Sequence, residues 1–525
     1  MQLASATAVE VILWPWVCFW MMFRMQLADP SLIKTGLLLN GVWLQKPDIG
    51  LSGDDSAEVN TSVHHFVVTN PANLKDVAWV NNASAADAEQ AIVYAVQAQS
   101  LWQQQLASER ALLLKSWYQL VLQHQHDLAL ILATEQGKPL AEASAEIRYA
   151  ASFIEWFAEE AKRLYGDLIP TTAQGRRLLT IKQPVGVVAA ITPWNFPAAM
   201  VTRKLAPALA AGCTVILKPS ELTPLTALAL GELAQRAGFP PGVLQMLPTK
   251  NAAAVAQVLC QSPMIRKLTF TGSTSVGKLL MRQCADTVKR LSLELGGNAP
   301  VLVFADADLT KAVAGVMAAK FRNAGQTCVC INRIYVERSV YDRFNSLLSE
   351  EIQQLKLGDA LTPGVQIGPL INTAAIQKVS ALVQDAISKG ARLNCGGQGS
   401  TLGPNFYQPT LLTEVTQEMQ LMQQEIFGPV AAVMPFDNEQ QAIDLANQSA
   451  AGLAAYLYSS DIGRLWRLAE ALEVGMVGIN ETAISTEVIP FGGVKESGLG
   501  REGSRYGMDE YLEIKHLCWG GLAQS

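Results

Sequence analysis

Cys328 is the residue of this chain whose surroundings most suggest chemistry. It ends the run Asn323-Ala324-Gly325-Gln326-Thr327-Cys328, whose glycine favours a turn. A thiolate attacks carbonyl carbons, but a free thiol has a pKa of about 8.5 and is mostly protonated at pH 7. An isolated cysteine is more often a small residue of the core. Whether Cys328 is a nucleophile or a core residue therefore depends on what the neighbouring segments contain.

A carboxylate and an amide upstream could act together with such a thiol. Glu294 lies in the apolar run 291–295, where burying a carboxylate is costly. It could deprotonate a water molecule, or it could be an ion-paired structural group. Asn195 lies in Pro193-Trp194-Asn195-Phe196-Pro197. A rigidly held amide there could stabilise an oxyanion, although a lone asparagine in a turn is more often structural.

Two other segments could bind a nucleotide. Residues 270–278 predict a strand, a turn and a helix N-terminus, which can hold a phosphate through backbone N–H groups. Only Gly272 and Gly277 are present, so this is not the GxGxxG fingerprint, and alone it is a weak signal. In Lys218-Pro219-Ser220-Glu221, a carboxylate could accept both hydroxyls of a ribose and would repel a 2′-phosphate.

The elements around these segments follow the pattern of parallel α/β sheets. From about residue 185 to 300, short apolar runs such as 185–191 alternate with helical segments such as 223–236. The pattern restarts after Gly297 with a strand at 300–304 and a helix at 308–322. Residues 161–184 interrupt it with turns around two extended runs. We therefore expect two α/β domains, with Cys328 at the edge of the second and facing the first.

Composition narrows the class of protein. A chain of 525 residues with 50% hydrophobic and 16% charged residues suits an enzyme of two or three domains. A net charge of −6 without a basic tract argues against nucleic-acid partners. The 8 cysteines are mostly isolated, which favours a reducing, cytoplasmic location. The 5 histidines show neither HExxH nor CxxC spacing, so no metal site is expected.

The first residues form an unusual segment. The apolar run 11–23 is shorter than the roughly 20 residues that span a bilayer, and it lacks the features of a signal peptide. We expect Met25 to be the working start, with residues 1–24 a disordered or misassigned extension and with no stable membrane insertion. A weak membrane-surface anchor is the alternative. The polar residues 48–63 predict a surface loop.

The segments around Asn195, Glu294 and Cys328 resemble the active site of the aldehyde dehydrogenase superfamily, and the resemblance runs from about Met25 to the C-terminus. It implies a Rossmann-like NAD-binding domain (25–160 and 185–296), an α/β catalytic domain (297–504) and a β oligomerisation hairpin (161–184 and 505–525) in a homodimer or homotetramer. It also implies that Cys328 is the nucleophile, that Asn195 and the Cys328 N–H bind the oxyanion, and that Glu294 is the base that cleaves a thioester. Lys204 matches a family lysine close to this region.

The same resemblance implies an NAD(P) site. Glu425 is expected at the nicotinamide ribose and Phe427 beside the nicotinamide ring. NADP-preferring relatives tend to carry a small residue in place of Glu221, so we expect NAD rather than NADP. The expected cofactor-binding residues are Thr192, Trp194, Lys218, Ser220, Glu221, Gly272, Ser273, Gly277, Leu295, Glu425 and Phe427.

Within the superfamily the chain is most similar to succinate-semialdehyde dehydrogenases, notably over 199–204, 490–504 and 511–515. Arg203 and Arg322 match the two arginines that bind the substrate carboxylate, and Ser485 matches a serine of the same site. Thr482 departs from the usual glycine, which leaves glutarate semialdehyde open because one methylene discriminates by only about 1–3 kcal/mol. A broad-specificity aldehyde dehydrogenase and a non-enzymatic protein on this scaffold are further alternatives.

A second cysteine follows the expected nucleophile. In the subfamily resembled, a cysteine at the position of Cys330 can pair with the nucleophile under oxidation. Such a bridge would be strained and easily reduced. The alternative is that Cys330 only packs in the core.

Overall fold

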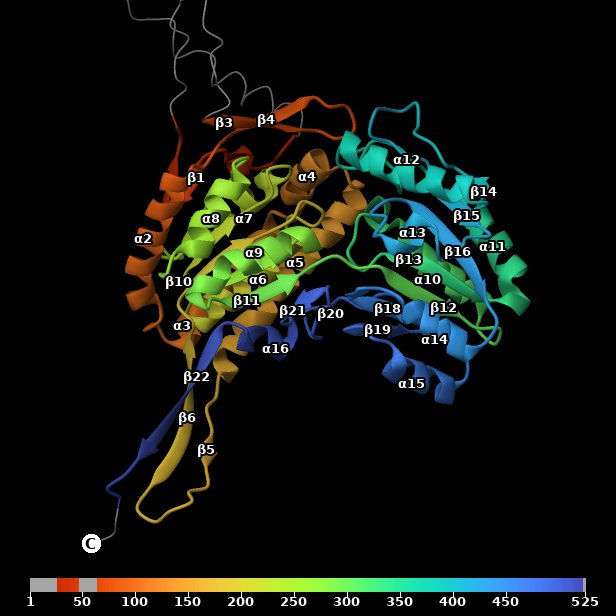
Figure 1. Ribbon diagram of the computed structural model, residues 1–525. Coiled ribbons are helices and arrows are strands. Elements are labelled where there is room, and N and C mark those ends of the chain that lie inside the picture. Colours follow the sequence, from red (N-terminus) through yellow and green to blue (C-terminus); the bar gives the residue numbers. More distant parts are fainter. Residues whose placement is uncertain (1–25, 47–63, 523–525) are drawn as a thin grey trace, which may run out of the picture.

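The computed structural model describes residues 26–46 and 64–522. Two α/β lobes lie side by side, and a narrow arm of strands projects from the first lobe (Figure 1). The expected extension 1–24, the start at Met25 and the expected loop 48–63 fall outside the described residues. Across the described part, no helix is both long enough and apolar enough to cross a membrane.

The first lobe is built on an eight-stranded sheet. The strand order is β2-β1-β9-β8-β7-β10-β11-β21, and the neighbours from β9 to β11 run parallel. The strands are β1 (Leu37–Leu39), β2 (Val42–Leu44), β7 (Val187–Ile191), β8 (Val215–Lys218), β9 (Leu244–Met246), β10 (Ile265–Thr271), β11 (Arg290–Glu294) and β21 (Gly498–Leu499).

Strand β7 shows why the strands of this lobe have continuous apolar sequences. All five of its residues are buried, and alternate side chains enter different cores. Val188 and Ala190 pack into one core, whereas Val187, Ala189 and Ile191 pack into the other. A parallel strand covered on both faces carries apolar residues at every position, which confirms the predicted alternation of strands and helices.

Helices cover both faces of this sheet (Figure 1). One face carries α3 (Ala107–Gln123), α4 (Gln125–Gln136), α5 (Leu140–Glu160), α6 (Ala199–Ala211) and α7 (Pro224–Arg236). The other face carries α2 (Ala85–Trp102), α8 (Ala252–Gln261) and α9 (Thr274–Cys284). Two short strands, β3 (His65–Thr69) and β4 (Asp76–Asn81), form a separate hairpin.

The second lobe contains a seven-stranded sheet in the order β14-β15-β16-β13-β12-β18-β19. Its strands are β12 (Ala299–Val303), β13 (Ile331–Glu337), β14 (Arg392–Cys395), β15 (Thr410–Thr413), β16 (Val430–Phe436), β18 (Ala454–Tyr458) and β19 (Met476–Ile479). Its helices are α10 (Leu309–Phe321), α11 (Tyr341–Gln353), α12 (Thr373–Ser388), α13 (Gln420–Gln423), α14 (Glu439–Asn447) and α15 (Ile462–Ala471). A single core of buried residues holds this lobe together.

The chain crosses between the lobes more than once. Residues 480–493 lead from the second sheet to β20 (Val494–Lys495), which pairs with β17 (Ala451–Gly452). Strand β21 then pairs with β11 and extends the first sheet, and α16 (Ser504–Asp509) follows. The expected catalytic segment 297–504 is therefore shared between the two sheets, because β21 near its end belongs to the sheet of the first lobe.

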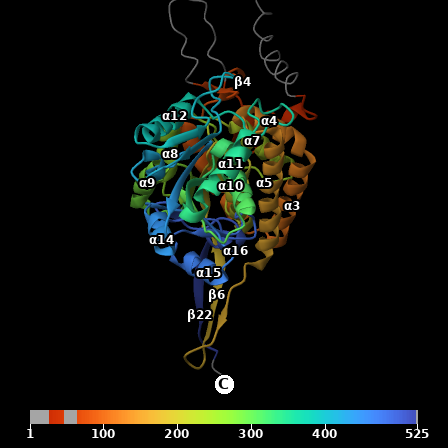
Figure 2. The ribbon, with the colours of Figure 1, turned by 90° about the vertical axis from the view of Figure 1, so that its right-hand side faces the viewer.

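The projecting arm combines two distant parts of the sequence. Strand β6 (Arg177–Pro184) pairs with β5 (Leu168–Ile169) and with β22 (Leu512–Trp519), where Leu512 faces Pro184 and Trp519 faces Arg177. Both views show the arm leaving the body of the molecule (Figures 1 and 2). Leu168 is 74% exposed, Ile514 71% and Trp519 64%. Exposed apolar side chains gathered in this way are typical of an interaction surface.

Candidate active site

The order of the parallel strands places a crevice at the carboxyl ends of β7 and β10. From β7 the chain builds outward to β8 and β9, and it then returns to the other side of β7 to build β10 and β11. Ligands of open α/β sheets bind at such a switch point. A cavity of about 390 Å³ lies there, lined from the first lobe by Trp194, Asn195, Gly272, Ser273, Glu294 and Leu295.

The second lobe closes this cavity and brings the nucleophile to it. Cys328, Glu425 and Phe427 line it from that side, together with Lys378 of α12. The three segments singled out in the sequence, around Asn195, Glu294 and Cys328, therefore meet in one place. The shared cavity makes them the candidate site.

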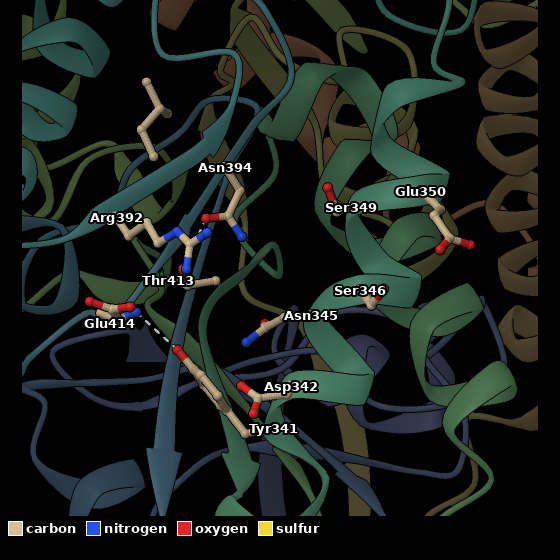
Figure 3. Close-up of a pocket in the computed structure, with 11 residues that line it drawn as sticks. Tyr341, Asp342, Asn345, Ser346, Ser349, Glu350, Arg392, Asn394, Thr413 and Glu414 are labelled. Carbon is tan, nitrogen blue, oxygen red and sulfur yellow. Dashed lines mark hydrogen bonds between the residues drawn. The ribbon is translucent and has the colours of Figure 1, made fainter.

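A second pocket, of about 480 Å³, lies between α11 and the strands β14 and β15 (Figure 3). Its lining is polar and includes Asp342, Arg392 and Glu414, whose backbone N–H donates to the Tyr341 hydroxyl at 2.9 Å. None of the residues expected to do chemistry lines it. The cavity that contains Cys328 is the better candidate despite its smaller volume.

The loop before Cys328 is held in an uncommon backbone conformation. Asn323, Ala324 and Gly325 have φ values of 51°, 54° and 75°, and non-glycine residues in this region persist only where their surroundings fix them. The Asn323 amide donates to the backbone oxygens of Asn195 at 3.0 Å and Gln326 at 3.2 Å. Gln136 donates to the Asn323 side-chain oxygen at 3.0 Å. These bonds hold the turn that presents the thiol.

Gly297 lets a neighbouring segment approach the nucleophile. A Cβ at this position would lie 2.2 Å from the carbonyl oxygen of Cys328. Any other residue would push the segment after β11 away from the thiol. Gly297 is thereby explained by close packing of two backbones, whereas a Cβ at Gly296 would lie 3.2 Å from the Glu425 carboxylate.

Asn195 is fixed from two sides. Its side-chain amide donates to the backbone oxygen of Gln326 at 3.0 Å, so it lies against the loop of Cys328. Its own carbonyl accepts from Nζ of Lys138 at 2.8 Å. Lys138 forms a buried ion pair with Glu146 at 2.5 Å, and Glu146 also accepts from the backbone N–H of Ala198 at 3.0 Å.

The surroundings of Cys328 disfavour its thiolate. Burial raises the pKa of Cys328 to about 12, supported by Glu425 and Glu294 and opposed by the positive charges of Arg203 and Arg322. A further positive charge beside the sulfur would favour the thiolate. Both arginines are therefore close enough for their charges to act on the nucleophile.

Glu294 ends β11 inside a cluster of charges. Burial and then the charge of Glu502 raise its pKa well above the usual range, against Arg203 and Lys204. Its Oε2 makes no hydrogen bond. Lys204 pairs with Glu502 and donates to Thr271 at 2.6 Å. A buried carboxyl whose pKa is raised and whose neighbours carry charges of both signs suits acid–base chemistry.

Arg203 is buried between two aromatic rings. Its guanidinium carbon lies 4.0 Å from the ring of Phe491 and 5.4 Å from that of Phe153. Its Nη2 lies 3.0 Å from Oε2 of Glu502, without the alignment of a hydrogen bond. Nε and Nη2 thus have no hydrogen-bond acceptor.

Several expected residues do not line the cavity. The Arg322 guanidinium lies 5.4 Å from the ring of Phe196 and borders a different pocket. Ser485 is hydrogen-bonded to the hydroxyl of Tyr149. The buried sulfur of Cys330 lies 3.3 Å from Nζ of Lys320.

The cofactor segments fit a dinucleotide. The Ser273 hydroxyl caps α9 by accepting from the N–H of Val276 at 3.4 Å, and a Cβ at Gly277 would lie 2.4 Å from Leu295. The close packing on Leu295 fixes the N-terminus of α9, and helix N-termini can hold a phosphate through their N–H groups. The Thr192 N–H donates to the Lys218 carbonyl at 3.2 Å, which joins the ends of β7 and β8, and Ser220 is buried just beyond.

Glu425 and Phe427 line the cavity from the second lobe. Glu425 accepts from the N–H of Gly297 at 3.3 Å. Phe427 has a φ of 58°, and its ring meets that of Trp194 edge to face at 5.5 Å. Glu221, which does not line this cavity, lies 3.4 Å from Nζ of Lys218.

Comparison with known proteins agrees with this geometry. Residues 59–517 match the model of the aldehyde dehydrogenase family. The chain belongs to the aldehyde dehydrogenase family. As in this family generally, it is an NAD(P)-dependent oxidoreductase with the aldehyde dehydrogenase fold.

Several members of the aldehyde dehydrogenase family are similar over nearly their whole length. The 3-sulfolactaldehyde dehydrogenase of Pseudomonas putida is 52% identical, over 95% of this chain and 99% of the relative. The succinate-semialdehyde dehydrogenase [NADP(+)] GabD of Escherichia coli is 52% identical, over 94% of this chain and all of the relative. The crystal structure of succinate-semialdehyde dehydrogenase from Burkholderia pseudomallei has a TM-score of 0.90 at 51% identity and covers 94% of this chain and 99% of that chain.

Several groups of this aldehyde dehydrogenase site carry no recognisable signal in the sequence. Lys138 and Glu146 hold the Asn195 loop, and Glu502 lies between Lys204 and Arg203. Lys138 and Glu146 are eight positions apart in a helical region, where a charge pair usually lies at the surface, so no local signal marked them. Within the described ranges, no group of three or more His, Cys, Asp or Glu residues could hold a metal ion.

Proposed function

We propose that this aldehyde dehydrogenase oxidises succinate semialdehyde to succinate. The observation that carries the proposal is Arg203, a buried guanidinium whose Nε has no acceptor, whose Nη2 meets only Glu502 without forming a hydrogen bond, and whose charge acts on Cys328. Buried hydrogen-bond donors normally have an acceptor. A carboxylate at the far end of an aldehyde substrate would be such an acceptor. Arg322, whose charge also acts on Cys328, would be the second anion-binding residue, and Ser485 would add a hydroxyl.

In the proposed reaction the Cys328 thiolate attacks the aldehyde carbon. The side-chain amide of Asn195 and the N–H of Cys328 donate to the oxygen as it becomes an oxyanion. Bound NAD(P) supplies the hydride acceptor and a positive charge that favours the thiolate. Glu294 then takes a proton from water, which attacks the resulting thioester and releases the acid and the thiol. Lys204 forms an ion pair with Glu502 and thereby offsets the negative charge that Glu502 places near Glu294.

The residues proposed to hold the dinucleotide come from both lobes. Gly272, Ser273 and Gly277 would take the pyrophosphate, and Thr192, Lys218, Ser220 and Glu221 the adenosine ribose. Trp194, Leu295, Glu425 and Phe427 would surround the nicotinamide riboside.

We propose NAD as the preferred cofactor, although a similar relative carries NADP(+) in its name. The Glu221 carboxylate would repel a 2′-phosphate. Replacing Glu221 by Ser is expected to raise kcat/KM for NADP relative to NAD by about tenfold or more, since the replacement removes a like-charge contact. A wild-type enzyme that prefers NADP would overturn this assignment.

A second substrate is favoured by one relative. The name of the Pseudomonas putida protein is 3-sulfolactaldehyde dehydrogenase, and its sulfonate would present oxygens to Arg203 much as a carboxylate does. Glutarate semialdehyde and uncharged aldehydes complete the set of alternatives.

The test is a panel of these aldehydes with NAD and with NADP at fixed enzyme concentration. We expect the highest kcat/KM with succinate semialdehyde and NAD. Arg322→Gln should raise KM for succinate semialdehyde about tenfold or more and leave KM for butanal nearly unchanged, because a hydrogen bond to a charged group is worth about 1.5–3 kcal/mol. An equal effect on both substrates would favour a broad-specificity enzyme.

The arm formed by β5, β6 and β22 is proposed to join subunits in a homodimer or homotetramer. Its exposed Leu168, Ile514 and Trp519 would be covered by a second copy. Light scattering of the wild type and of Ile514→Glu would test this, with a smaller assembly expected for the variant.

A further inference from the structure

Helix α5 is tied to the segment that follows β19. The hydroxyls of Tyr149 and Ser485 are hydrogen-bonded to each other. One turn further along α5, the Ser152 hydroxyl donates to Oε2 of Glu487 at 3.1 Å. Residues three apart share one face of a helix, so this face of α5 fixes the position of the segment 480–493.

The same face of α5 borders Arg203. The ring of Tyr149 meets that of Phe153 edge to face at 5.0 Å, and the Arg203 guanidinium lies over Phe153 and Phe491. The charge of Arg203 also acts on Tyr149, on Glu294 and on Cys328. The phenol, the Ser485 hydroxyl and the guanidinium therefore form one cluster around Phe153.

Arg203 alone would attract an anionic substrate only weakly. Glu502 lies 3.0 Å from its Nη2, and that carboxylate offsets much of the attraction that the guanidinium would exert. Additional donors are needed for tight binding of a carboxylate. Tyr149 is half-buried, whereas Arg203 and Phe153 are fully buried, so solvent reaches the phenol but neither of the other two side chains.

We propose that Tyr149 is a specificity-determining residue that binds the anionic end of the substrate. Its hydroxyl donates to the substrate carboxylate while it accepts from the hydroxyl of Ser485, and it thereby sets how far from Cys328 the anion binds. The inference rests on the proposed function, because it assigns a further contact for the same anionic aldehyde.

The test compares kcat/KM for succinate semialdehyde and for butanal in the wild type and in Tyr149→Phe. Phenylalanine keeps the ring on Phe153 and removes only the hydroxyl. We expect the ratio of the two kcat/KM values to fall about tenfold through KM for the semialdehyde, since the lost hydrogen bond involves a charged acceptor. Tyr94→Phe, at a half-buried tyrosine of α2, is the matched control and should leave the ratio unchanged.

The possible outcomes separate the inference from the proposed function. A wild type that shows no preference for the semialdehyde overturns both. A wild type that shows the preference, together with a folded Tyr149→Phe variant of unchanged ratio, overturns the inference alone. If the variant does not fold, Tyr149→Met serves instead: it also removes the phenol hydroxyl and should lower the ratio about tenfold, and an unchanged ratio in that variant again overturns the inference.

Discussion

Nζ of Lys138 donates to the backbone oxygen of Asn195 at 2.8 Å, and the same ammonium pairs with Glu146 at 2.5 Å. Both side chains of the ion pair are only 1% exposed. A buried charge left without its partner is strongly destabilising. The junction between α4 and α5 therefore fixes the loop that is proposed to hold the oxyanion.

Lys138→Met is expected to lower the free energy of unfolding by about 3–5 kcal/mol, because Glu146 would remain buried without a cation. Denaturant unfolding would measure the change. Lys162→Met is the matched control, since Lys162 pairs with Glu159 at 2.8 Å at the surface, where such pairs contribute about 0–1 kcal/mol. Equal effects of the two substitutions would contradict the assignment.

Glu294→Gln should separate the two halves of the proposed reaction. Steady-state turnover is expected to fall about 10²–10⁴-fold, because the amide cannot take a proton from water. A burst of reduced cofactor should persist, since attack by Cys328 and hydride transfer precede hydrolysis. Stopped-flow absorbance measures both phases, and loss of the burst would show that Glu294 acts earlier.

The carboxyl of Glu425 gives the enzyme a pH dependence near neutrality. Burial raises its pKa from 4.5 to about 7, and a carboxylate accepts ribose hydroxyls better than a protonated carboxyl does. KM for NAD is therefore expected to fall as the pH rises through 7, and to stay flat in Glu425→Gln.

The carboxyl of Glu425 should also make the stability of the folded protein decrease as the pH rises. Because its pKa is raised in the folded protein, its contribution to stability is complete below pH 4.5 and is lost as the pH rises through about 7. The wild type should thus lose stability relative to Glu425→Gln as the solution becomes more alkaline. The opposite trend would rule out this titration.

Oxidation should distinguish the two interpretations of Cys330. If Cys330 pairs with Cys328, peroxide inactivates the wild type reversibly and a dithiol restores the activity. Cys330→Ala should recover far less, because an oxidised Cys328 without a partner proceeds to irreversible acids. Cys395→Ala, at a half-buried thiol of β14, is the control. Equal recovery in wild type and Cys330→Ala would mean that Cys330 only packs beside Lys320.

Much of the first lobe could be predicted from local pattern. The run that became β7 is buried at every position, and such runs are readily recognised between helices. The predicted strand, turn and helix around Gly272 correspond to β10 and α9. The pairing of β22 with β6 and the return of β21 to the first sheet could not be predicted in register, because the partners lie far apart in the sequence.

The sequence by itself determined which residue types could do the chemistry and what strands and helices would carry them, because side-chain identity and the periodicity of apolar residues are local properties. Only the tertiary structure decided what surrounds each group: the Lys138 ammonium on the Asn195 loop, Glu502 between Lys204 and Arg203, and Tyr149 against Ser485. Burial and neighbouring charges set the pKa of Cys328 and of Glu294. Those surroundings are assembled from both lobes, so they exist only once the chain has folded.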